Sequence, residues 1–314
     1  MNYSDFLISI IIPMKNESAG VEILFSRLEP ILDSLAKTGG KWEIICVNDG
    51  SNDNTLEILR AKSLVNPRVK VLSLSRNFGK EAALTAGLEY AKGDVVVPLD
   101  ADLQDPPELI PEMVSQWKNG FKVVLATRKT RNESWMKRKS AGAFYNIMGR
   151  FSTVRIPKNT GDFRLIDRQV VEAVKLLPER TRFMKGLFAW AGFKTTTIYF
   201  DRPARFAGTT NWNYWKLWKF ALDGIFSFST FPLKIWTYIG VIISLISFLY
   251  GSFLIIRTLL YGSDVPGYAS LMTVILFLGG IQLISLGIIG EYIGRIYRET
   301  KHRPLYVIEE KIGF

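Results

Sequence analysis

Three aspartates stand close together in the segment VVVPLDADLQDPPELIP, directly after an apolar run. They are Asp100, Asp102 and Asp105, and carboxylates this close repel one another unless water or a cation separates them. A hard divalent cation binds through one or two carboxylates together with substrate phosphates, which Asp100 and Asp102 could supply. Such a cation would neutralise a diphosphate leaving group. Taken alone, the D-x-D pattern is more often a solvated turn, and Asp105 before two prolines fits a helix N-cap.

The composition excludes several other kinds of site. The 314 residues include one cysteine, Cys46, and one histidine, His302, so internal disulfides, Cys or His metal clusters and Ser-His triads are excluded. Any metal must therefore use oxygen ligands. The 40 Lys and Arg residues outnumber the 29 Asp and Glu residues, giving a net charge of +11. This excess favours polyanionic partners such as anionic lipid, nucleic acid or phosphorylated metabolites.

Short apolar runs alternate with helix-length segments through the first part of the chain. This alternation predicts a mostly parallel sheet with helices on both faces, in which ligands bind beyond the carboxyl ends of the strands. The expected strands are residues 7–12, 42–47, 69–74, 95–99 and 123–126. Polar clusters follow the first four of them, at residues 15–17, 48–51, 75–77 and 100–102. We therefore expect a polar binding site at that edge of the sheet.

Two long stretches near the end of the chain carry no charge. Residues 235–256 and 265–290 contain 22 and 26 residues, respectively. At about 1.5 Å per residue the shorter makes a helix of about 33 Å, and bilayer hydrocarbon is about 30 Å thick. Lysines and arginines lie before the first stretch and after the second, which predicts that both flanks are cytoplasmic. The alternative is a pair of buried core helices.

Two further segments have the composition of a membrane interface. Eight basic residues and one acid lie between Arg128 and Arg155, and Phe144, Ile147, Met148 and Phe151 follow helical spacing. This pattern predicts a basic amphipathic helix lying on anionic lipid, or alternatively a solvated helix docked on the core. Before the first uncharged stretch, tryptophans and lysines alternate in NWNYWKLWKF. That composition is typical of the aromatic and basic belt beside a membrane span.

Ordered motifs along almost the whole chain resemble a known family. IIPMKNE, VNDGSNDNT, SRNFGKEAALTAGL and DADLQDPPE resemble the family 2 glycosyltransferases of GT-A fold. The continuation through GDFRLIDRQV, RPARFAGTTNW and FALDGIFSFS is similar to the bacterial polyprenyl-phosphate glycosyltransferases, relatives of dolichol-phosphate mannose synthase. The resemblance implies an α/β, Rossmann-like GT-A catalytic domain followed by two transmembrane helices.

The resemblance also implies a division of the chain. Residues 1–210 form the cytoplasmic catalytic domain, with the basic interface helix near 135–152, and residues 211–230 form an amphipathic juxtamembrane helix. Residues 231–294 hold two transmembrane helices, at about 235–256 and 267–290, and residues 295–314 form a cytoplasmic basic tail. The expected location is the inner (plasma) membrane, crossed more than once.

Site residues follow from the motifs that match. The resemblance implies that Asp100, Asp102 and Gln104 hold Mg²⁺ or Mn²⁺, and that Asp162 in GDFRLI lies at the reacting centre. Arg205 in RFAG is expected to help bind phosphate, and Asp102 and Arg205 to take part in catalysis. The expected nucleotide-sugar pocket consists of Pro13, Asn16, Glu17, Asp49, Asn77, Lys80, Asp100, Arg128 and Arg131. Asp49 is expected to meet the base.

The acceptor chemistry needs no strong base. A lipid monophosphate has a second pKa of about 6, so near pH 7 it is mostly a dianion and can attack directly. We expect in-line attack on the anomeric carbon with inversion, Asp162 acting as an orienting group, and Arg128, Arg131 and Arg205 screening the two anions. The expected partners are a nucleotide sugar, polyprenyl phosphate and anionic membrane lipids, and not nucleic acid.

Several alternatives stay open at this stage. The expected reaction is hexose transfer to undecaprenyl phosphate with UDP-glucose as the donor, and GDP-mannose or a UDP-N-acetylhexosamine would fit the same scaffold. A processive polysaccharide synthase is disfavoured because no QxxRW motif precedes the uncharged stretches. A membrane-tethered nucleotide-sugar binder without catalysis is the rival from another class. Gly290 and Gly294 form a GxxxG pair, which is compatible with a homo-oligomer.

Overall fold

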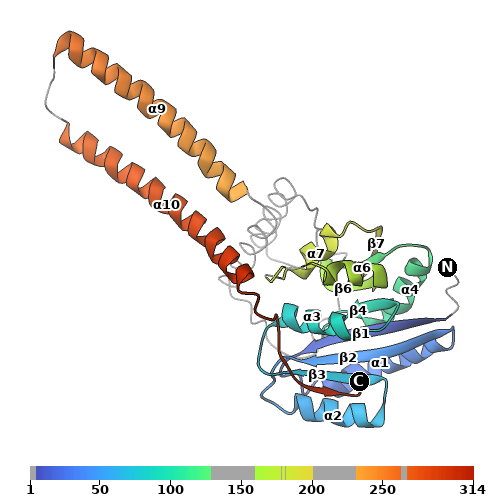
Figure 1. The fold of residues 1–314 in the computed structure, drawn as a ribbon. Helices are drawn as coiled ribbons and strands as arrows, with labels where there is room; N and C mark the ends of the chain where they lie inside the picture. Colours follow the sequence, from blue (N-terminus) through green and yellow to red (C-terminus); the bar gives the residue numbers. More distant parts are fainter. Residues whose placement is uncertain (1–4, 129–159, 178, 181, 201–230, 263–266) are drawn as a thin grey trace.

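A single sheet forms the centre of the molecule in the computed structural model (Figure 1). The structure describes residues 5–128, 160–177, 179–180, 182–200, 231–262 and 267–314. Its strands are β1 (Phe6–Met14), β2 (Gly40–Asn48), β3 (Val69–Leu74), β4 (Val95–Pro98), β5 (Val123–Arg128), β6 (Thr160–Asp167), β7 (Thr195–Phe200) and β8 (Ile308–Ile312). They form one eight-stranded sheet in the order β7-β5-β6-β4-β1-β2-β3-β8. All five strands predicted from the apolar runs are present, with ends that differ by a few residues.

The central strand β1 is buried on both faces. Ile8, Ile10 and Ile12 contribute to a core on one face, and Ile11 to a second core on the other, and all four are 0% exposed. A strand covered on both sides reads as a continuous apolar run, as the sequence ISIIIP does here. The sheet is therefore the middle layer of three.

Helices cover each face of the sheet. The first core is closed by α1 (Val21–Ala36), α2 (Thr55–Val65), η1 (Pro107–Leu109) and α4 (Ile110–Lys118). The second is closed by α3 (Lys80–Tyr90), α6 (Arg168–Lys175) and α7 (Met184–Trp190). Helix α3 packs especially close to the sheet, because a Cβ added at Gly87 would lie 2.2 Å from Cγ2 of Ile11. That approach brings the first residue of α3, Lys80, close to the strand ends.

The sheet is more mixed than the sequence pattern predicts. Strand β1 pairs in parallel with β2 and β4, β2 with β3, and β5 with β7. In contrast, β6 runs antiparallel to β4 and β5, and β8 runs antiparallel to β3. Both antiparallel strands come from segments outside the predicted strand and helix alternation. The expectation of a basic tail at residues 295–314 was therefore incomplete, because β8 lies within it and extends the sheet.

Asp105 does not act as the predicted helix N-cap. The residue at the cap position of η1 is Pro106, and no side-chain hydrogen bond caps that helix. The Asp105 side chain is instead buried, with 3% of the residue exposed. The second of the two prolines that follow it, Pro107, is the first residue of η1, a position that its fixed φ favours.

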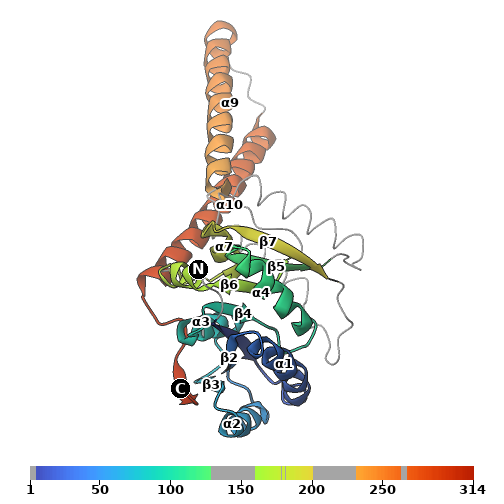
Figure 2. The same ribbon diagram turned by 90° about the vertical axis from the view of Figure 1, so that its right-hand side faces the viewer.

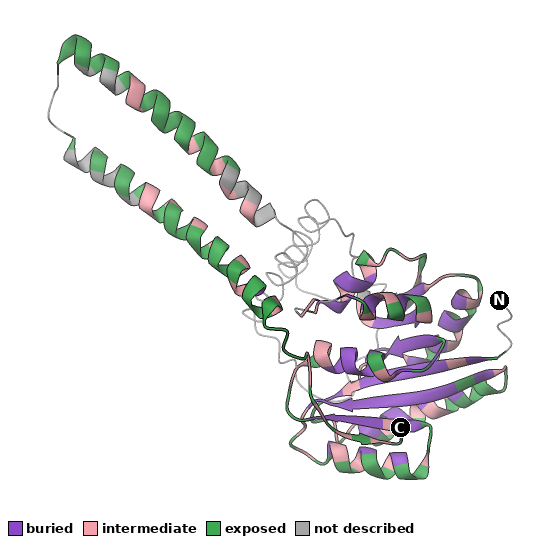
Figure 3. Cartoon of the chain, viewed as in Figure 1, coloured by how far each residue is buried: buried purple, intermediate pink, exposed green. Residues whose placement is uncertain are grey.

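A helical hairpin projects away from the sheet (Figures 1 and 2). It consists of α9 (Phe231–Tyr261) and α10 (Tyr268–Thr300), and most of its described side chains are exposed (Figure 3). Among the described residues, one helix, Phe277–Thr300, is long and apolar enough to cross a membrane. Tyr238–Phe253 of α9 is apolar but shorter. The two helices are thus confirmed as helices, whereas only one of the two predicted spans meets this criterion.

Two predicted interface segments lie outside the described residues. These are the basic helix near 135–152 and the juxtamembrane helix at 211–230. Arg131 and Arg205 also lie outside the described residues. Arg128 is described only as the last residue of β5.

Candidate active site

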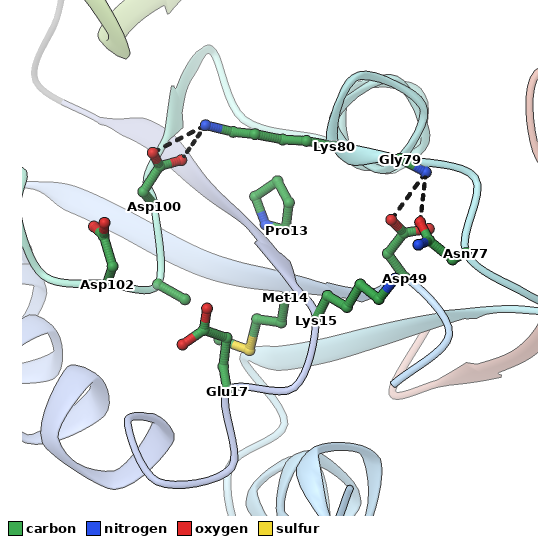
Figure 4. Close-up of a pocket in the computed structure, with 11 residues that line it drawn as sticks. Pro13, Met14, Lys15, Glu17, Asp49, Asn77, Gly79, Lys80, Asp100 and Asp102 are labelled. Carbon is green, nitrogen blue, oxygen red and sulfur yellow. Dashed lines mark hydrogen bonds and ion pairs between the residues drawn. The ribbon is translucent and has the colours of Figure 1, made fainter. Parts of the chain in front are cut away.

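A pocket of about 290 Å³ opens at the edge of the sheet where β1, β2 and β4 end (Figure 4). Its walls come from the end of β1, from the loops after β1, β2, β3 and β4, and from the start of α3. The lining residues are Pro13, Met14, Lys15, Glu17, Asp49, Asn77, Gly79, Lys80, Asp100, Ala101 and Asp102. The polar clusters that follow separate strands in the sequence therefore meet in one place, as expected for parallel strands.

Asp49 fixes the loop that leads into α3. Its Oδ1 accepts a hydrogen bond from the Phe78 backbone N–H at 2.7 Å, and its Oδ2 accepts one from Gly79 at 3.0 Å. Gly79 has φ +97, a left-handed value that favours glycine. The loop also passes so close to Gly50 that an added Cβ would lie 2.6 Å from backbone atoms of Arg76. Asp49 thus shapes the pocket, and its contact with a base stays a prediction.

Asn16 supports the pocket from the side and is not one of its lining residues. Its backbone N–H donates to Ser51 Oγ at 3.0 Å, and its Oδ1 accepts from the Asn52 N–H at 2.8 Å. It has φ +56, a left-handed value that asparagine tolerates better than most residues. These bonds join the loop after β1 to the loop after β2, so Asn16 positions its neighbour Glu17, which does line the pocket.

Asp53 completes the joint between these two loops. Its carboxylate accepts hydrogen bonds from the Ser18 backbone N–H at 3.2 Å and from Thr55 Oγ1 at 2.5 Å. Burial works to raise the pKa of Asp53, but the hydrogen bonds from Thr55 and Ser18 outweigh it and lower the pKa to about 2. The carboxylate is therefore ionised at neutral pH, and it holds the loop after β1 against the loop after β2.

Lys80 joins Asp100 to Asp162, which the sequence separates by 62 positions. Its Nζ lies 2.6 Å from Asp100 Oδ1 and 2.6 Å from Asp162 Oδ2. A second lysine, Lys185 of α7, approaches the other Asp162 oxygen at 3.6 Å. This network places Asp162 next to the pocket, and its expected role at the reacting centre stays a prediction.

The network fixes the charges of its members. Burial opposes ionisation of Asp162, but Lys185 and Lys80 hold its pKa well below the usual range. Burial likewise opposes the charge on Lys80, and Asp100 and Asp162 more than offset this by raising the pKa of Lys80. A carboxylate with a lowered pKa is a weak proton acceptor, so Asp162 is better suited to orient charged groups than to act as a base.

Two further charged residues, Arg164 and Glu81, interact with Asp162. The Arg164 guanidinium, on the same face of β6, donates to the Gly161 carbonyl at 2.8 Å and lies over the Phe188 ring. Burial, together with the charge of Asp162, raises the pKa of Glu81 to about 7. The Met184 N–H donates to Glu81 Oε2 at 3.4 Å, which ties α3 to α7. The i, i+2 spacing of Asp162 and Arg164 in GDFRLI could have revealed Arg164, whereas no local signal points to Glu81 or Lys185.

Asp100 and Asp102 fit a divalent cation that shares its coordination with substrate. Both line the pocket, and two carboxylates with substrate phosphates and water form a common ligand set for Mg²⁺. Within the described part of the chain, no group of three or more His, Cys, Asp or Glu residues could hold a metal ion by itself. Gln104 is buried, is not a lining residue, and its Oε1 has no hydrogen-bond partner. Two of the three predicted metal ligands therefore line the pocket, and metal binding by each of the three stays a prediction.

Most predicted site residues that the structure describes come together. Seven of them line the pocket, namely Pro13, Glu17, Asp49, Asn77, Lys80, Asp100 and Asp102. Asp162 joins them through Lys80, and Asn16 supports them from outside. The sequence prediction did not include Met14, Gly79 or Ala101, whose contribution depends on where the backbone passes.

Two family models match this chain. The model described as "Glycosyl transferase family 2" matches residues 9–175, and the one described as "GtrB C-terminal hairpin" matches residues 231–296. The first match contains every residue that lines the pocket, together with Asp162. The second contains nearly all of α9 and α10.

Relatives match over nearly the full length. An uncharacterized glycosyltransferase of Synechocystis sp. is 60% identical, covering 98% of this chain and 96% of its own. The bactoprenol glucosyl transferase of Shigella phage SfV is 49% identical, covering 97% and 98%. A prophage bactoprenol glucosyl transferase homolog of Escherichia coli is 48% identical, covering 96% and 98%. The chain therefore belongs to glycosyl transferase family 2 and is a glycosyltransferase that carries a GtrB-type C-terminal hairpin.

Proposed function

We propose that the protein transfers glucose from UDP-glucose to polyprenyl (undecaprenyl) phosphate and inverts the anomeric configuration. The observation that carries this proposal is the 49% identity, over 97% of the chain, to a protein named bactoprenol glucosyl transferase. The pocket at the sheet edge supports the same reading, because its carboxylates suit a nucleotide diphosphate held with a cation.

Asp100 and Asp102 would hold Mg²⁺ or Mn²⁺ against the donor diphosphate, with Gln104 as a further candidate. The bound cation supplies charge neutralisation of the nucleotide as it leaves the sugar. Lys15 and Lys80 add positive charge to the same walls. Glu17 and Asn77 would orient the nucleotide, and Pro13 would give it an apolar surface.

The acceptor is proposed to react as a phosphate dianion. Its oxygen attacks the anomeric carbon from the side opposite the departing diphosphate, which inverts that centre. No proton has to be removed, which agrees with an Asp162 that is ionised and paired with Lys80 and Lys185. We assign Asp162 the task of orienting these lysines towards the reacting phosphates. Arg128, Arg131 and Arg205 are proposed to screen the repulsion between acceptor and donor.

Both hairpin helices are proposed to cross the inner membrane, with the catalytic domain on the cytoplasmic side. Support comes from the exposed apolar side chains of α9 and α10 and from the basic residues that flank the uncharged stretches. The polyprenyl tail would then lie along the hairpin, and anionic lipids would contact the basic segment near 135–152. This arrangement keeps a water-soluble donor and a membrane-bound acceptor at one site.

Product analysis tests the proposal. The purified full chain in lipid vesicles is incubated with undecaprenyl phosphate and radiolabelled UDP-glucose, GDP-mannose or UDP-N-acetylglucosamine, each with and without a chelator. We expect a single lipid-extractable glucose product that a chelator prevents. Transfer from another donor alone would reject the proposed sugar, and polymer formation would indicate a processive synthase. Nucleotide-sugar binding without any product would indicate a tethered binder.

A further inference from the structure

The Lys80 ammonium lies between carboxylates that come from two different strands. Asp100 follows β4 and Asp162 lies on β6, and the Lys80 Nζ is 2.6 Å from an oxygen of each. It also lies 2.9 Å from the second Asp100 oxygen, so it faces both oxygens of that carboxylate. Figure 4 shows the Lys80 side chain crossing above Pro13 to reach Asp100, with Asp102 beside it. The ammonium thus occupies the approach to the carboxylate that fits a metal ion.

We propose that Lys80 is a built-in counter-ion of the metal site, which yields Asp100 to the divalent cation, keeps its pairing with Asp162 and turns to the donor phosphates. This inference rests on the proposed function, since it requires a cation at Asp100 and Asp102. Lys80 is in this view a positioning residue that links two binding events. It neutralises the acidic edge before the cation binds, and it contributes to donor binding afterwards.

The need for a counter-ion follows from the charges on the pocket edge. Asp100 and Asp102 are separated by one residue, and Asp162 is joined to them through the same lysine. Unscreened carboxylates at these separations would repel one another and loosen the loop after β4. A lysine is suited to screen them because its ammonium has three donors on a flexible stem. The same ammonium repels an arriving divalent cation, so the two cannot share Asp100 closely.

Lys80 can move away from Asp100 without leaving Asp162 or its own ammonium without a partner of opposite charge. Its side chain is 44% exposed, and the residue lies in the first turn of α3 on the pocket wall. When Lys80 leaves Asp100, its contact with Asp162 can persist, and Lys185 already faces the other oxygen of Asp162. The negative charge of a donor diphosphate then replaces that of Asp100 as the partner of Lys80.

A plain structural ion pair makes the opposite prediction. If Lys80 only held the loop in shape, removing it would disorder Asp100 and weaken metal binding. If Lys80 competes for Asp100, removing it strengthens metal binding to the nucleotide-free protein. The same removal weakens nucleotide binding once the cation is present, because the donor loses a positive partner. The sign of the first effect therefore separates the two accounts.

The test measures Mn²⁺ binding to the nucleotide-free full chain by electron paramagnetic resonance, for wild type, Lys80→Met and Lys15→Met. Lys15 lines the same pocket and makes no ion pair with any of the described residues, so its removal controls for the general loss of one positive charge. We expect Lys80→Met to bind Mn²⁺ about tenfold more tightly than Lys15→Met does, a change within the usual range for coupled sites. UDP binding in saturating Mn²⁺ should be weaker by a similar factor in Lys80→Met.

Further variants make each outcome decisive. Lys80→Arg keeps the charge and should bind Mn²⁺ like the wild type, and Lys80→Gln replaces Lys80→Met if thermal unfolding shows that the latter is misfolded. If Asp102→Asn abolishes Mn²⁺ binding, the metal site itself is present. In that case, a neutral Lys80 variant that binds Mn²⁺ no more tightly than Lys15→Met overturns the inference about Lys80 and leaves the proposed function standing. Unchanged Mn²⁺ binding in Asp102→Asn overturns both the inference and the metal site of the proposed function.

Discussion

The sheet and the helical hairpin are both rich in apolar residues, but the sheet buries them and the hairpin exposes them. Ile8 and Ile10 of β1 are 0% exposed, whereas Phe248 and Leu259 of α9 are 71% and 81% exposed. A water-soluble surface seldom carries a continuous apolar area of more than a few hundred Å². The sheet thus makes its own apolar interior, whereas the exposed apolar side chains of the hairpin are the reason for proposing that it lies in a bilayer.

The two regions meet through the C-terminal tail. After α10 ends at Thr300, the chain returns to the sheet and β8 pairs with β3. Near this junction the Arg180 backbone N–H donates to the Glu299 carboxylate at 2.9 Å, and Tyr306 bonds to Glu89. The tail therefore ties the end of the proposed membrane segment to the sheet that carries the pocket. We therefore expect the sheet to carry the chemistry, the hairpin to anchor the protein and the tail to align the two.

The largest expected effect concerns the chemistry of the sheet. Asp102→Asn removes one charge from the proposed metal site and should lower glucosyl transfer by roughly 10²–10³-fold, as expected for loss of one electrostatic contributor. Activity in vesicles and thermal unfolding are measured together. The matched control, Glu112→Gln, changes an exposed acid on α4 and should leave both unchanged. Near-normal turnover of a folded Asp102→Asn protein would remove the metal role.

The next effect compares an isoleucine in each region directly. Ile10→Ala leaves a cavity in a core with no exposed surface and should lower the free energy of unfolding by about 2–5 kcal/mol. Ile246→Ala makes the same change on α9, where the residue is 60% exposed, and should cost less than about 1 kcal/mol. Chemical denaturation of the full chain, followed by tryptophan fluorescence, gives both values. Equal losses would mean that the hairpin face is packed against protein.

A smaller expected effect is the dependence of the free energy of unfolding on pH that Glu81 causes in the sheet domain. Because its pKa is raised from 4.5 in the unfolded chain to about 7, the folded protein retains this proton over a range where the unfolded chain has lost it. Stability should therefore fall as pH rises from about 4.5 to 7, by roughly 1–2 kcal/mol after allowance for its partial exposure. The charged groups that face Glu81 are Asp162, Lys80, Lys185 and Arg164.

Glu81→Gln tests this assignment because glutamine mimics the protonated carboxyl. Unfolding of the variant and the wild type is measured at several pH values between 4.5 and 8. The variant should lose the fall in stability across that window. The behaviour of Asp162 provides an internal contrast, because its pKa is lowered and its contribution is lost only as pH falls below its ordinary value. A slope that persists in Glu81→Gln would assign the pH dependence to another group.

The sequence predicted the parts of the sheet that depend on local pattern. Apolar runs such as ISIIIP and VVVP became buried strands, and the polar residues that follow them lined one pocket, because parallel strands end at a common edge. The antiparallel strands were missed for a physical reason. Strand β6 alternates polar and apolar residues, and β8 is short and charged, so each is stabilised by pairing with a distant strand.

The candidate site shows the same limit. Asp100 and Asp102 were expected from a local motif and Asp162 from the family resemblance, whereas the pairing of the lysines with these acids was not foreseen. Lys80 was predicted to bind the donor and not to pair with both acids, and Lys185 comes from a helix with no local signal of function. Contacts between residues far apart in the chain depend on how α3 and α7 pack against β6, and a pattern in one segment carries no information about that packing.

The smallest expected effect lies in the tail that aligns the two regions. Arg60 of α2 pairs with Glu310 of β8, and their side chains are 45% and 38% exposed. Exposed ion pairs contribute about 0–1 kcal/mol and are weakened by salt. Glu310→Gln should therefore lower the free energy of unfolding only slightly, and the difference should vanish in about 1 M salt. A larger or salt-insensitive loss, measured by denaturation at both salt concentrations, would mean that this pair helps to hold β8 in register on β3.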